Sequence, residues 1–363
     1  MQSIIVRQKK QQGTEEICIG NDIISTLVNK KLLNKYDKVL FVADVNVYEK
    51  YKAYIDNIAK SLDSENVILV KPELEFKDFN NCGIIFDKLV DMKASRKSCL
   101  VAIGGGYVGD LVGFTASVYM RGIDFVQIPS TFMAMADGVI GKVAINYNGH
   151  KNIIGNFYSP RYIFCDTNFL ESLKEEEILF GMVEVWKHAL LKNNREVINK
   201  IETFLNGGEI DLEKIIYFSM KTKKDFVKAD LEDTKGRHKA LSLGHTFANY
   251  LEAHKNFRHG VAVFYGIIFS TILSFELNKV GNKKYRSILS TAALFEKSIN
   301  GLKKLQIEID MEHILEKLKF DKINSHGGYS FVLLDNGGYM VNTGMSKELI
   351  RKGLNKLKEL SFE

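Results

Sequence analysis

The chain has 363 residues, of which 45% are hydrophobic and 26% charged, and its formal net charge at pH 7 is +6. No stretch approaches the roughly 20 uninterrupted apolar residues of a membrane span, and residues 1–12 lack a basic head followed by a long apolar run. The lysines are spread along the chain, and the four cysteines show no C-x-x-C spacing. We therefore expect a cytoplasmic protein of two domains that binds neither membrane nor nucleic acid and has no thiolate metal site.

The first half of the chain alternates short apolar runs with helical patterns. Runs typical of strands cover residues 4–7, 17–20, 39–43, 67–70, 100–103, 125–129 and 162–165. Helical patterns cover 48–62 and 79–92, and a third, apolar pattern ends at Arg121. Because strands separated by helices form a mostly parallel sheet covered on both faces, we predict an α/β domain over residues 1–170.

From residue 171 the pattern changes to one helix after another. The predicted helices cover residues 175–191, 196–205, 212–229, 245–254, 260–277 and 347–360. Ser346 is placed to cap the last of them, and one hairpin interrupts the series with Asp335-Asn336-Gly337-Gly338 as its turn. We therefore place a second, mostly helical domain over residues 171–363.

Three glycines follow the strand predicted at 100–103. They are Gly104, Gly105 and Gly106, and Gly109 and Asp110 lead from them into the next helix. Backbone N–H groups without side chains approach a phosphate closely, and a helix N-terminus adds about half a positive charge. The stretch is a candidate pyrophosphate cradle for a dinucleotide, although a tight turn explains the glycines equally well.

Asp44 follows the strand predicted at 39–43. In parallel sheets ligands bind beyond the carboxyl ends of the strands, where an acidic side chain accepts a hydrogen bond from a ribose hydroxyl. A helix N-cap is an equally good explanation of an aspartate at this position. The sequence leaves both explanations open.

Three polar side chains stand in apolar helical surroundings of the second domain. Glu184 lies within GMVEVWKHALL, His245 begins the helix in LSLGHTFANYLE, and His259 opens the helix in HGVAVFYGI. A carboxylate in an apolar run must be paired, metal-bound or exposed, and one carboxylate with two imidazoles fits a Zn²⁺ ion with an open position. The spacings follow no compact rule, so histidines satisfied by the core remain an alternative, and His188 and His254 are rival ligands.

Taken together, these segments resemble the sugar-phosphate cyclases, the family of 3-dehydroquinate synthase. GGGYVGD resembles the NAD-binding glycine turn of the family, and YMRG, IPST, GKVAIN and KNIIG resemble its phosphate-side motifs. GMVEVWK, LGHTF and HGVAV resemble its three metal-ligand segments. Their order and spacing also agree, and the resemblance covers most of the chain.

The resemblance implies a Rossmann-like dinucleotide-binding domain, a C-terminal, mostly helical metal-binding domain and a homodimer. It implies Zn²⁺ or Co²⁺ held by Glu184, His245 and His259. The residues that it implies for NAD⁺ are Asp44, Asn46, Lys77, Gly104, Gly105, Gly106, Asp110 and Thr131. Those that it implies for the sugar phosphate substrate are Asp137, Lys142, Lys151, Asn152 and Lys187, with Arg121 reaching a phosphate across a dimer interface.

The reaction that the resemblance implies forms a carbocycle from a keto sugar phosphate. A ring carbinol next to the metal is oxidised, phosphate is eliminated, the hydride returns, and an intramolecular aldol step closes the ring. Lys142, Asn152 and Arg121 would meet the charge of the departing phosphate. NAD⁺ would therefore turn over without net redox change.

Several positions depart from the family pattern on the substrate side. His238 and Ser242 stand where the synthase pattern has an Arg and an Asn, with Arg237 adjacent; Asn249 replaces a His, and Ile323 replaces a late Lys. A weaker partner does not replace a bidentate Arg on a carboxylate. We therefore expect a changed carboxylate end, so that a heptulose or hexose phosphate fits as well as the seven-carbon keto acid phosphate.

Two other functions stay open. An NAD- and metal-dependent polyol dehydrogenase would accumulate NADH and release no phosphate, but it leaves Lys142, Lys151 and Asn152 without a role. A non-catalytic NAD-binding homologue would keep the fold with a damaged pocket, but the ligand set and Lys187 are retained.

Overall fold

The chain divides into two compact units. A computed structural model describes residues 2–5, 16–25, 32–61, 66–71, 76–138, 140–229, 238–255, 257–299, 311–318 and 329–360. Residues 1–174 and 212–221 form the first unit, and residues 175–211 and 222–363 form the second. The first unit thus extends past residue 170, where we placed the domain boundary, and includes the first turns of α8 (Leu212–Ala229).

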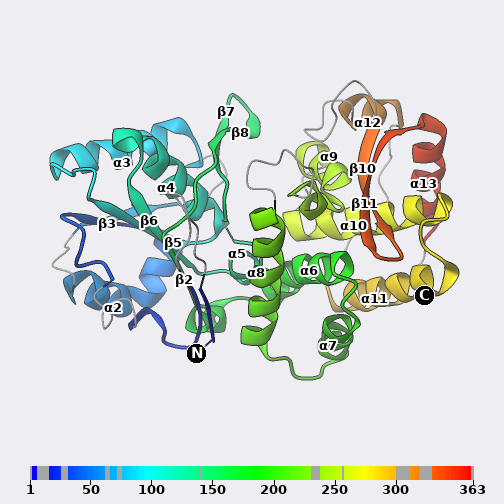
Figure 1. Cartoon of the computed structure of the whole chain (residues 1–363), viewed down its shortest axis with the longest axis horizontal. Helices are drawn as coiled ribbons and strands as arrows, with labels where there is room; N and C mark the ends of the chain where they lie inside the picture. The colour runs from blue at the N-terminus through cyan, green and yellow to red at the C-terminus, as the bar shows by residue number, and fades with distance from the viewer. Residues whose placement is uncertain are drawn as a thin grey trace. The chain divides into compact units, whose positions relative to one another are not determined.

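The first unit contains a seven-stranded sheet (Figure 1). Its strands in spatial order are β1 (Gln2–Ile5), β2 (Glu16–Gly20), β9 (Tyr162–Asp166), β6 (Asp124–Pro129), β5 (Cys99–Gly104), β3 (Val39–Asp44) and β4 (Val67–Val70). Only the β1–β2 pair is antiparallel. The predicted α/β fold with a mostly parallel sheet is therefore confirmed. The strand predicted at 4–7 begins earlier, at Gln2, and residues 6 and 7 lie outside the described residues.

Helices cover both faces of this sheet, which explains why β3 and β5 are buried along their whole length. The helices of the unit are α2 (Val45–Ser61), α3 (Phe79–Asp91), α4 (Gly106–Val118) and α5 (Phe132–Ala136), with the 3₁₀ turns η2 (Tyr119–Arg121) and η3 (Thr167–Ser172). Leu40 and Leu100 of the sheet share one apolar cluster with Ile85 of α3 and Leu111 of α4. Figure 1 shows α2 on the opposite side of the sheet from α3 and α4.

Both ends of α4 differ from the prediction. α4 begins at Gly106, so Gly109 and Asp110 lie inside the helix and not before it. The helix also ends at Val118 and not at Arg121. Met120 and Arg121 have φ angles of 47° and 69°, which a right-handed helix does not accommodate.

A hairpin of β7 (Val143–Tyr147) and β8 (His150–Asn156) is a feature that the prediction missed. Asn148 and Gly149 connect its strands with φ angles of 47° and 76°, the backbone that a two-residue hairpin turn requires. The Asn-Gly pair between alternating apolar residues was a signal that could have found it.

The second unit is built around one buried helix, α10 (His259–Glu276). Around it lie α6 (Glu175–Leu191), α9 (His245–Lys255), α11 (Asn282–Ser298), α13 (Lys347–Glu359) and the strand β10 (Tyr329–Asp335). The remaining elements are α7 (Arg195–Leu205), η4 (His238–Ser242), α12 (Met311–Leu318) and β11 (Gly338–Met345). α10 is long and apolar enough for a membrane span, but 83% of that window is buried inside the protein, so it is a core helix.

Two local predictions in this unit are confirmed. β10 and β11 form the predicted hairpin, with Asp335 paired to Gly338 across the turn. The Ser346 hydroxyl caps α13 by accepting the backbone N–H of Leu349 at 3.3 Å. α11 and α12 were not predicted, although Ile288, Thr291, Ala292 and Phe295 give α11 a clear buried face.

Candidate active site

Two candidate residues of the first unit lie at the carboxyl ends of β3 and β5. From β3 the chain crosses to β4 on one side, and from β5 it crosses to β6 on the other. The order of the sheet therefore reverses between β3 and β5, which is where open α/β sheets bind their ligands. Asp44 ends β3 and Gly104 ends β5, and a Cβ placed on Gly104 would lie 3.2 Å from the Cβ of Asp44.

The glycine-rich turn leaves open space at the start of α4. A Cβ on Gly106 would have no atom within 4 Å, whereas one on Gly104 would lie 2.6 Å from the Cγ2 of Val108. Gly105 is the N-cap residue of α4, without a side-chain cap. Helix N-termini leave backbone N–H groups for an external acceptor, so this turn fits a closely bound phosphate.

Asp44 caps the helix that follows it. Its Oδ1 atom accepts the backbone N–H of Asn46 at 2.8 Å, and the residue is only 6% exposed. Burial raises the pKa of the Asp44 carboxyl above its usual value, against the opposing effect of the backbone N–H groups of Asn46 and Val47. The N-cap explanation is thus confirmed, and Asn46 lies exposed in the first turn of α2.

Lys77 joins two residues that we assigned to different ligands. Its buried ammonium pairs with Asp110 of α4 and donates to the Asn152 Oδ1 atom of β8 at 2.6 Å. Asn152 has a φ of 53°, and its N–H donates to the Asn146 side chain at 3.0 Å. The Asn146 N–H in turn donates to the Lys77 carbonyl at 2.7 Å. The structure therefore brings Lys77, Asp110 and Asn152 together in one network.

The other candidates of this unit lie on α5 and on the β7–β8 hairpin. Thr131 is the N-cap of α5, and its hydroxyl accepts the Ala134 N–H at 3.2 Å. Asp137 is the half-buried residue that follows α5. Lys142 and Lys151 are exposed at the hairpin.

Arg121 lies apart from this crevice within the first unit. It is exposed in η2, which follows the last residue of α4, whereas the glycine turn precedes the first. Since α4 has 13 residues and rises about 1.5 Å per residue, its two ends are roughly 20 Å apart. The structure does not bring Arg121 to the glycine turn.

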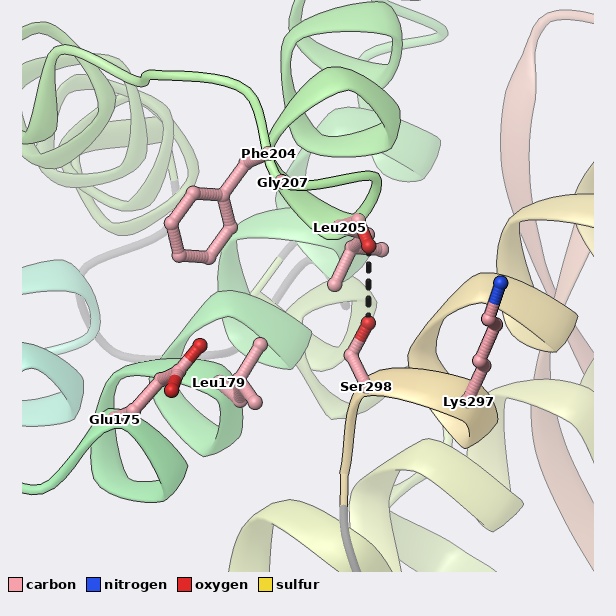
Figure 2. Close-up of a pocket in the computed structure, with 7 residues that line it drawn as sticks. All are labelled: Glu175, Leu179, Phe204, Leu205, Gly207, Lys297 and Ser298. Atoms are coloured by element: carbon pink, nitrogen blue, oxygen red, sulfur yellow. Dashed lines mark hydrogen bonds between the residues drawn. The ribbon is translucent and has the colours of Figure 1, made fainter.

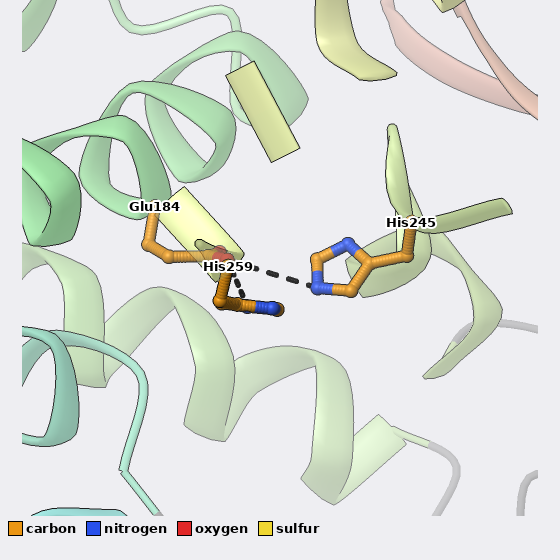
Figure 3. A group of neighbouring side chains, drawn as sticks. All are labelled: Glu184, His245 and His259. Atoms are coloured by element: carbon orange, nitrogen blue, oxygen red, sulfur yellow. Dashed lines mark ion pairs between the residues drawn. The ribbon is translucent and has the colours of Figure 1, made fainter. Parts of the chain in front are cut away.

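In the second unit, one carboxylate and two imidazoles converge (Figure 3). The Glu184 Oε1 atom of α6 lies 3.7 Å from the Nε2 atom of His245 and 3.3 Å from that of His259. One ligand atom from each of the three residues lies within 4.8 Å of the others. α9 and α10 begin at the two histidines, so helix starts position both imidazoles around the middle of α6.

Lys187 is part of the same group. Its Nζ atom lies 2.5 Å from the Glu184 Oε2 atom, and both side chains are almost completely buried. Burial would raise the pKa of Glu184, but the Lys187 ammonium and the two imidazoles hold it well below its usual value. Glu184 is therefore a buried, ionised carboxylate whose Oε2 atom faces Lys187 and whose Oε1 atom faces the two imidazoles.

Neither rival ligand joins the group of Glu184, His245 and His259. His188 is fully buried one turn after Glu184, and one of its ring nitrogens lies within 4.8 Å of a Glu184 carboxylate oxygen, but it is not grouped with the two histidines. The His254 ring contacts the His313 ring of α12 with centroids 4.8 Å apart.

Glu252 is a residue of this site that the sequence analysis missed. Its Oε1 atom lies 2.7 Å from the Nδ1 atom of His259. Burial alone would lower the pKa of the His259 imidazole, but the carboxylates of Glu184 and Glu252 raise it above its usual value. Glu252 follows His245 by seven residues, which places both on one face of α9, so helical spacing was an available signal.

A separate pocket of the second unit is lined by residues of α6, α7 and α11 (Figure 2). The Ser298 hydroxyl at its edge donates to the Leu205 carbonyl at 3.2 Å. None of the predicted site residues lines this pocket, so it is distinct from the group around Glu184.

The positions that depart from the family pattern are only partly described. Ser242 is half-buried at the end of η4, and Asn249 is exposed on α9 one turn after His245. His238 begins η4. Arg237 and Ile323 lie outside the described residues.

Comparison with known proteins identifies the family. Residues 67–179 match the 3-dehydroquinate synthase N-terminal family, and residues 181–324 match the 3-dehydroquinate synthase C-terminal family. A 3-dehydroquinate synthase of Staphylococcus epidermidis is 32% identical over 345 residues, which cover 94% of this chain and 95% of that protein.

Two solved structures share the fold. One is 2-epi-5-epi-valiolone synthase from Streptomyces hygroscopicus with NAD⁺ and Zn²⁺ bound, which is 19% identical and has a TM-score of 0.84 over 98% of this chain and 99% of that chain. The other is 2-deoxy-scyllo-inosose synthase complexed with carbaglucose-6-phosphate, NAD⁺ and Co²⁺, which is 22% identical and has a TM-score of 0.82 over 96% of this chain and 99% of that chain. The resemblance found in the motifs is confirmed: the chain belongs to the 3-dehydroquinate synthase family of sugar-phosphate cyclases.

Proposed function

We propose that this protein is a sugar-phosphate cyclase that uses NAD⁺ and a divalent metal ion. It converts a keto sugar phosphate into a carbocycle, with elimination of phosphate and intramolecular aldol closure. As a member of its family the protein is an enzyme of the phosphate-eliminating, carbon–oxygen lyase class. The observation that carries the proposal is the convergence of Glu184, His245 and His259 around one point.

The donor set around Glu184 fits a divalent cation. One carboxylate and two imidazoles suit Zn²⁺ and Co²⁺ alike and leave coordination positions for a substrate oxygen. The Oε1 atom of the buried Glu184 carboxylate faces the imidazoles, where a cation would lie, while its Oε2 atom pairs with Lys187. Glu184, His245 and His259 would hold such a cation, which would supply Lewis-acid polarisation of a carbinol oxygen.

The crevice at β3 and β5 fits NAD⁺. Gly104, Gly105 and Gly106 would admit the pyrophosphate to the start of α4, and Asp44 and Asn46 would bind the ribose hydroxyls at the adjacent strand end. Lys77, Asp110 and Thr131 complete the set that we assign to this cofactor. NAD⁺ supplies reversible hydride transfer, which makes the hydrogen next to the oxidised carbon acidic.

The remaining assigned residues would bind and orient the sugar phosphate. Lys142, Lys151 and Asn152 of the β7–β8 hairpin supply cationic and amide groups for the phosphate. Asn152 is fixed by Lys77, so the network supports its orientation. Asp137 and Lys187 are the groups that we assign to hydrogen bonding with the substrate hydroxyls.

Metal and cofactor dependence test this proposal. Phosphate release from a keto sugar phosphate should require both NAD⁺ and Zn²⁺ or Co²⁺, and chelation should abolish it reversibly. Glu184→Gln should lose both metal binding and phosphate release, whereas Glu196→Gln on exposed α7 is a control that should retain both. Phosphate release that persists in the chelated protein would contradict the proposed role of the metal.

For the substrate we propose an altered carboxylate end. Ser242 and Asn249 differ from the synthase pattern and lie on η4 and α9, close in sequence to His245. Loss of a buried charged contact commonly costs about 2–5 kcal/mol, or roughly 30-fold or more in affinity. Turnover of the seven-carbon keto acid phosphate with a micromolar Michaelis constant would refute the altered pocket and leave the cyclase proposal intact.

The family assignment favours the cyclase over the polyol dehydrogenase that the sequence left open. Parallel assays separate the two, since a dehydrogenase accumulates NADH and releases no phosphate. A non-catalytic homologue would do neither while still binding NAD⁺.

We further propose a homodimer in which Arg121 serves the site of the partner subunit. Arg121 lies about 20 Å from the glycine turn along α4, next to the exposed Met120. Exposed apolar side chains also gather on α3 and on the β7–β8 hairpin, where Ile84, Tyr147 and Ile153 are each more than half exposed. A second copy of the chain would cover this apolar surface.

Mixed dimers test the role of Arg121. Arg121→Ala and Glu184→Gln subunits should each be nearly inactive alone. When the two are co-expressed, a mixed dimer contains one intact site only if Arg121 acts across the interface. Recovered activity would support the proposal, and a mixture as inactive as its components would refute it.

We also propose that the enzyme works in the cytoplasm. Among the residues that the structure describes, the helix apolar enough to span a membrane, α10, is a buried core helix, and a relative is named 3-dehydroquinate synthase.

A further inference from the structure

Glu252 contacts the Nδ1 atom of His259, the ring nitrogen that does not face Glu184. The Glu252 Oε1 atom lies 2.7 Å from the Nδ1 atom of His259, and the Glu252 side chain is only 14% exposed. The opposite ring nitrogen, Nε2, lies 3.3 Å from the Glu184 Oε1 atom. A nitrogen this close to a carboxylate oxygen donates its N–H, so Glu252 favours the form of His259 with hydrogen on Nδ1.

His245 is oriented in the same sense by a weaker partner. Its Nδ1 atom lies 3.2 Å from the Leu243 carbonyl oxygen, and its Nε2 atom faces Glu184. Both imidazoles therefore have Nε2 facing the Glu184 carboxylate, while Nδ1 contacts an oxygen atom on the opposite side of the ring. A carboxylate behind an imidazole makes it a more basic ligand than a carbonyl does.

The contact between Glu252 and His259 rests on closely packed helices. α9 and α10 approach so closely that a Cβ on Gly266 would lie 2.0 Å from the carbonyl oxygen of Gly244. The first turn of α10 also packs against α6, because Arg258 donates to Glu176 at 2.9 Å and lies over the Phe180 ring. α9 and α10 are therefore in close contact, which supports the approach of Glu252 to His259.

We propose that Glu252 is the positioning residue of the metal site, which orients His259 and strengthens it as a ligand. This inference rests on the proposed function, since it assumes that Glu184, His245 and His259 bind a metal ion. Glu252 contacts the Nδ1 atom of His259, so it acts through the imidazole.

Two substitutions separate orientation from charge. Glu252→Gln keeps an oxygen that accepts the Nδ1–H but removes the negative charge, whereas Glu252→Leu removes both. Loss of a carboxylate behind a metal-bound histidine typically costs about 10–100-fold in metal affinity. We expect a loss in this range for Glu252→Leu and a smaller loss for Glu252→Gln.

The measurement is a titration of the purified, chelator-treated full chain with Co²⁺, followed by visible absorption and by competition with a chelator. The Co²⁺ bands should shift in the Leu variant, because a reoriented or weaker imidazole changes the ligand field. Glu196→Gln, which removes an exposed carboxylate paired with Lys200, should match the wild type. A purely structural role for Glu252 would lower the thermal midpoint of unfolding without moving the absorption bands.

The outcomes are distinct. If the wild type binds no Co²⁺, the metal site itself is wrong and this inference falls with it. If the wild type binds Co²⁺ and both Glu252 variants bind it within about twofold with unchanged bands, only the role of Glu252 is refuted. If Glu252→Leu fails to fold, the affinity and spectrum of Glu252→Gln decide the question.

Discussion

Replacing Lys187 with Met should destabilise the metal-free protein strongly. The Lys187 ammonium and the Glu184 carboxylate lie 2.5 Å apart, and their side chains are 1% and 0% exposed. Met keeps much of the apolar volume of Lys, so the substitution removes the charge without opening a large cavity. It leaves the buried Glu184 carboxylate without its ammonium partner, next to the two imidazoles.

The expected cost follows from burial. Removing one partner of a buried ion pair typically costs about 3–5 kcal/mol, because the remaining charge stays desolvated. For a unit of 150–250 residues, 1 kcal/mol shifts the thermal midpoint by about 2–4 °C, which gives a loss of roughly 6–20 °C. A divalent cation held by Glu184 compensates the same charge, so the loss should be much smaller in the metal-loaded protein.

Thermal unfolding with chelator measures the loss of stability in the metal-free protein, and thermal unfolding with saturating Zn²⁺ measures the smaller loss expected with metal bound. Lys192→Met is a matched control at the end of the same helix, because Lys192 forms an exposed pair with Asp225 at 3.2 Å. Such surface pairs are worth about 0–1 kcal/mol, so this variant should unfold close to the wild type. The reasoning is wrong if Lys187→Met and Lys192→Met unfold at the same temperature without metal.

Three further predictions concern other parts of the chain. Gly106→Ala should fold normally, since its Cβ meets open space, but it should weaken NAD⁺ binding about tenfold or more in equilibrium dialysis. Gly104→Ala should instead lower the free energy of unfolding by about 1–3 kcal/mol, because its Cβ would lie 2.6 Å from Val108. Lys77→Met removes the cation that pairs with Asp110 and should weaken NAD⁺ binding while Co²⁺ affinity stays unchanged. Lys352 and Lys356 lower the pKa of the Glu276 carboxyl below its usual 4.5. Ionised Glu276 therefore stabilises the folded protein above pH 4.5, and this stabilisation is lost as the pH falls through the lowered pKa. Urea unfolding of the wild type and Glu276→Gln should therefore converge in acid.

The sheet was predictable because its strands are buried on both faces. Residues 39–43 and 100–103 are continuously apolar and do not alternate with polar residues. This pattern is typical of strands that helices cover on both faces of a parallel sheet. The sequence indicated Glu184, His245 and His259 as a candidate group, since polar groups in apolar helices need partners. Their mutual distances were not predictable, because these depend on the packing of α6, α9 and α10.

The missed features depend on contacts between segments distant in sequence or on unusual backbone angles. The spacing of Glu252 from His245 places both on one face of α9, but the contact of Glu252 with His259 depends on the packing of α9 against α10. The early end of α4 depends on positive φ angles at Met120 and Arg121, two residues that ordinarily continue a helix. The share of α8 that belongs to the first unit likewise follows from tertiary packing and not from composition.

The central claim is carbocycle formation without net redox change, and one parallel assay tests it most directly. Inorganic phosphate and NADH absorbance are followed together, with metal ion and NAD⁺ present, for the seven-carbon keto acid phosphate, glucose 6-phosphate and sedoheptulose 7-phosphate. We predict stoichiometric phosphate release from at least one of them with no accumulation of NADH. Accumulation of NADH without phosphate release would contradict the account and identify a dehydrogenase.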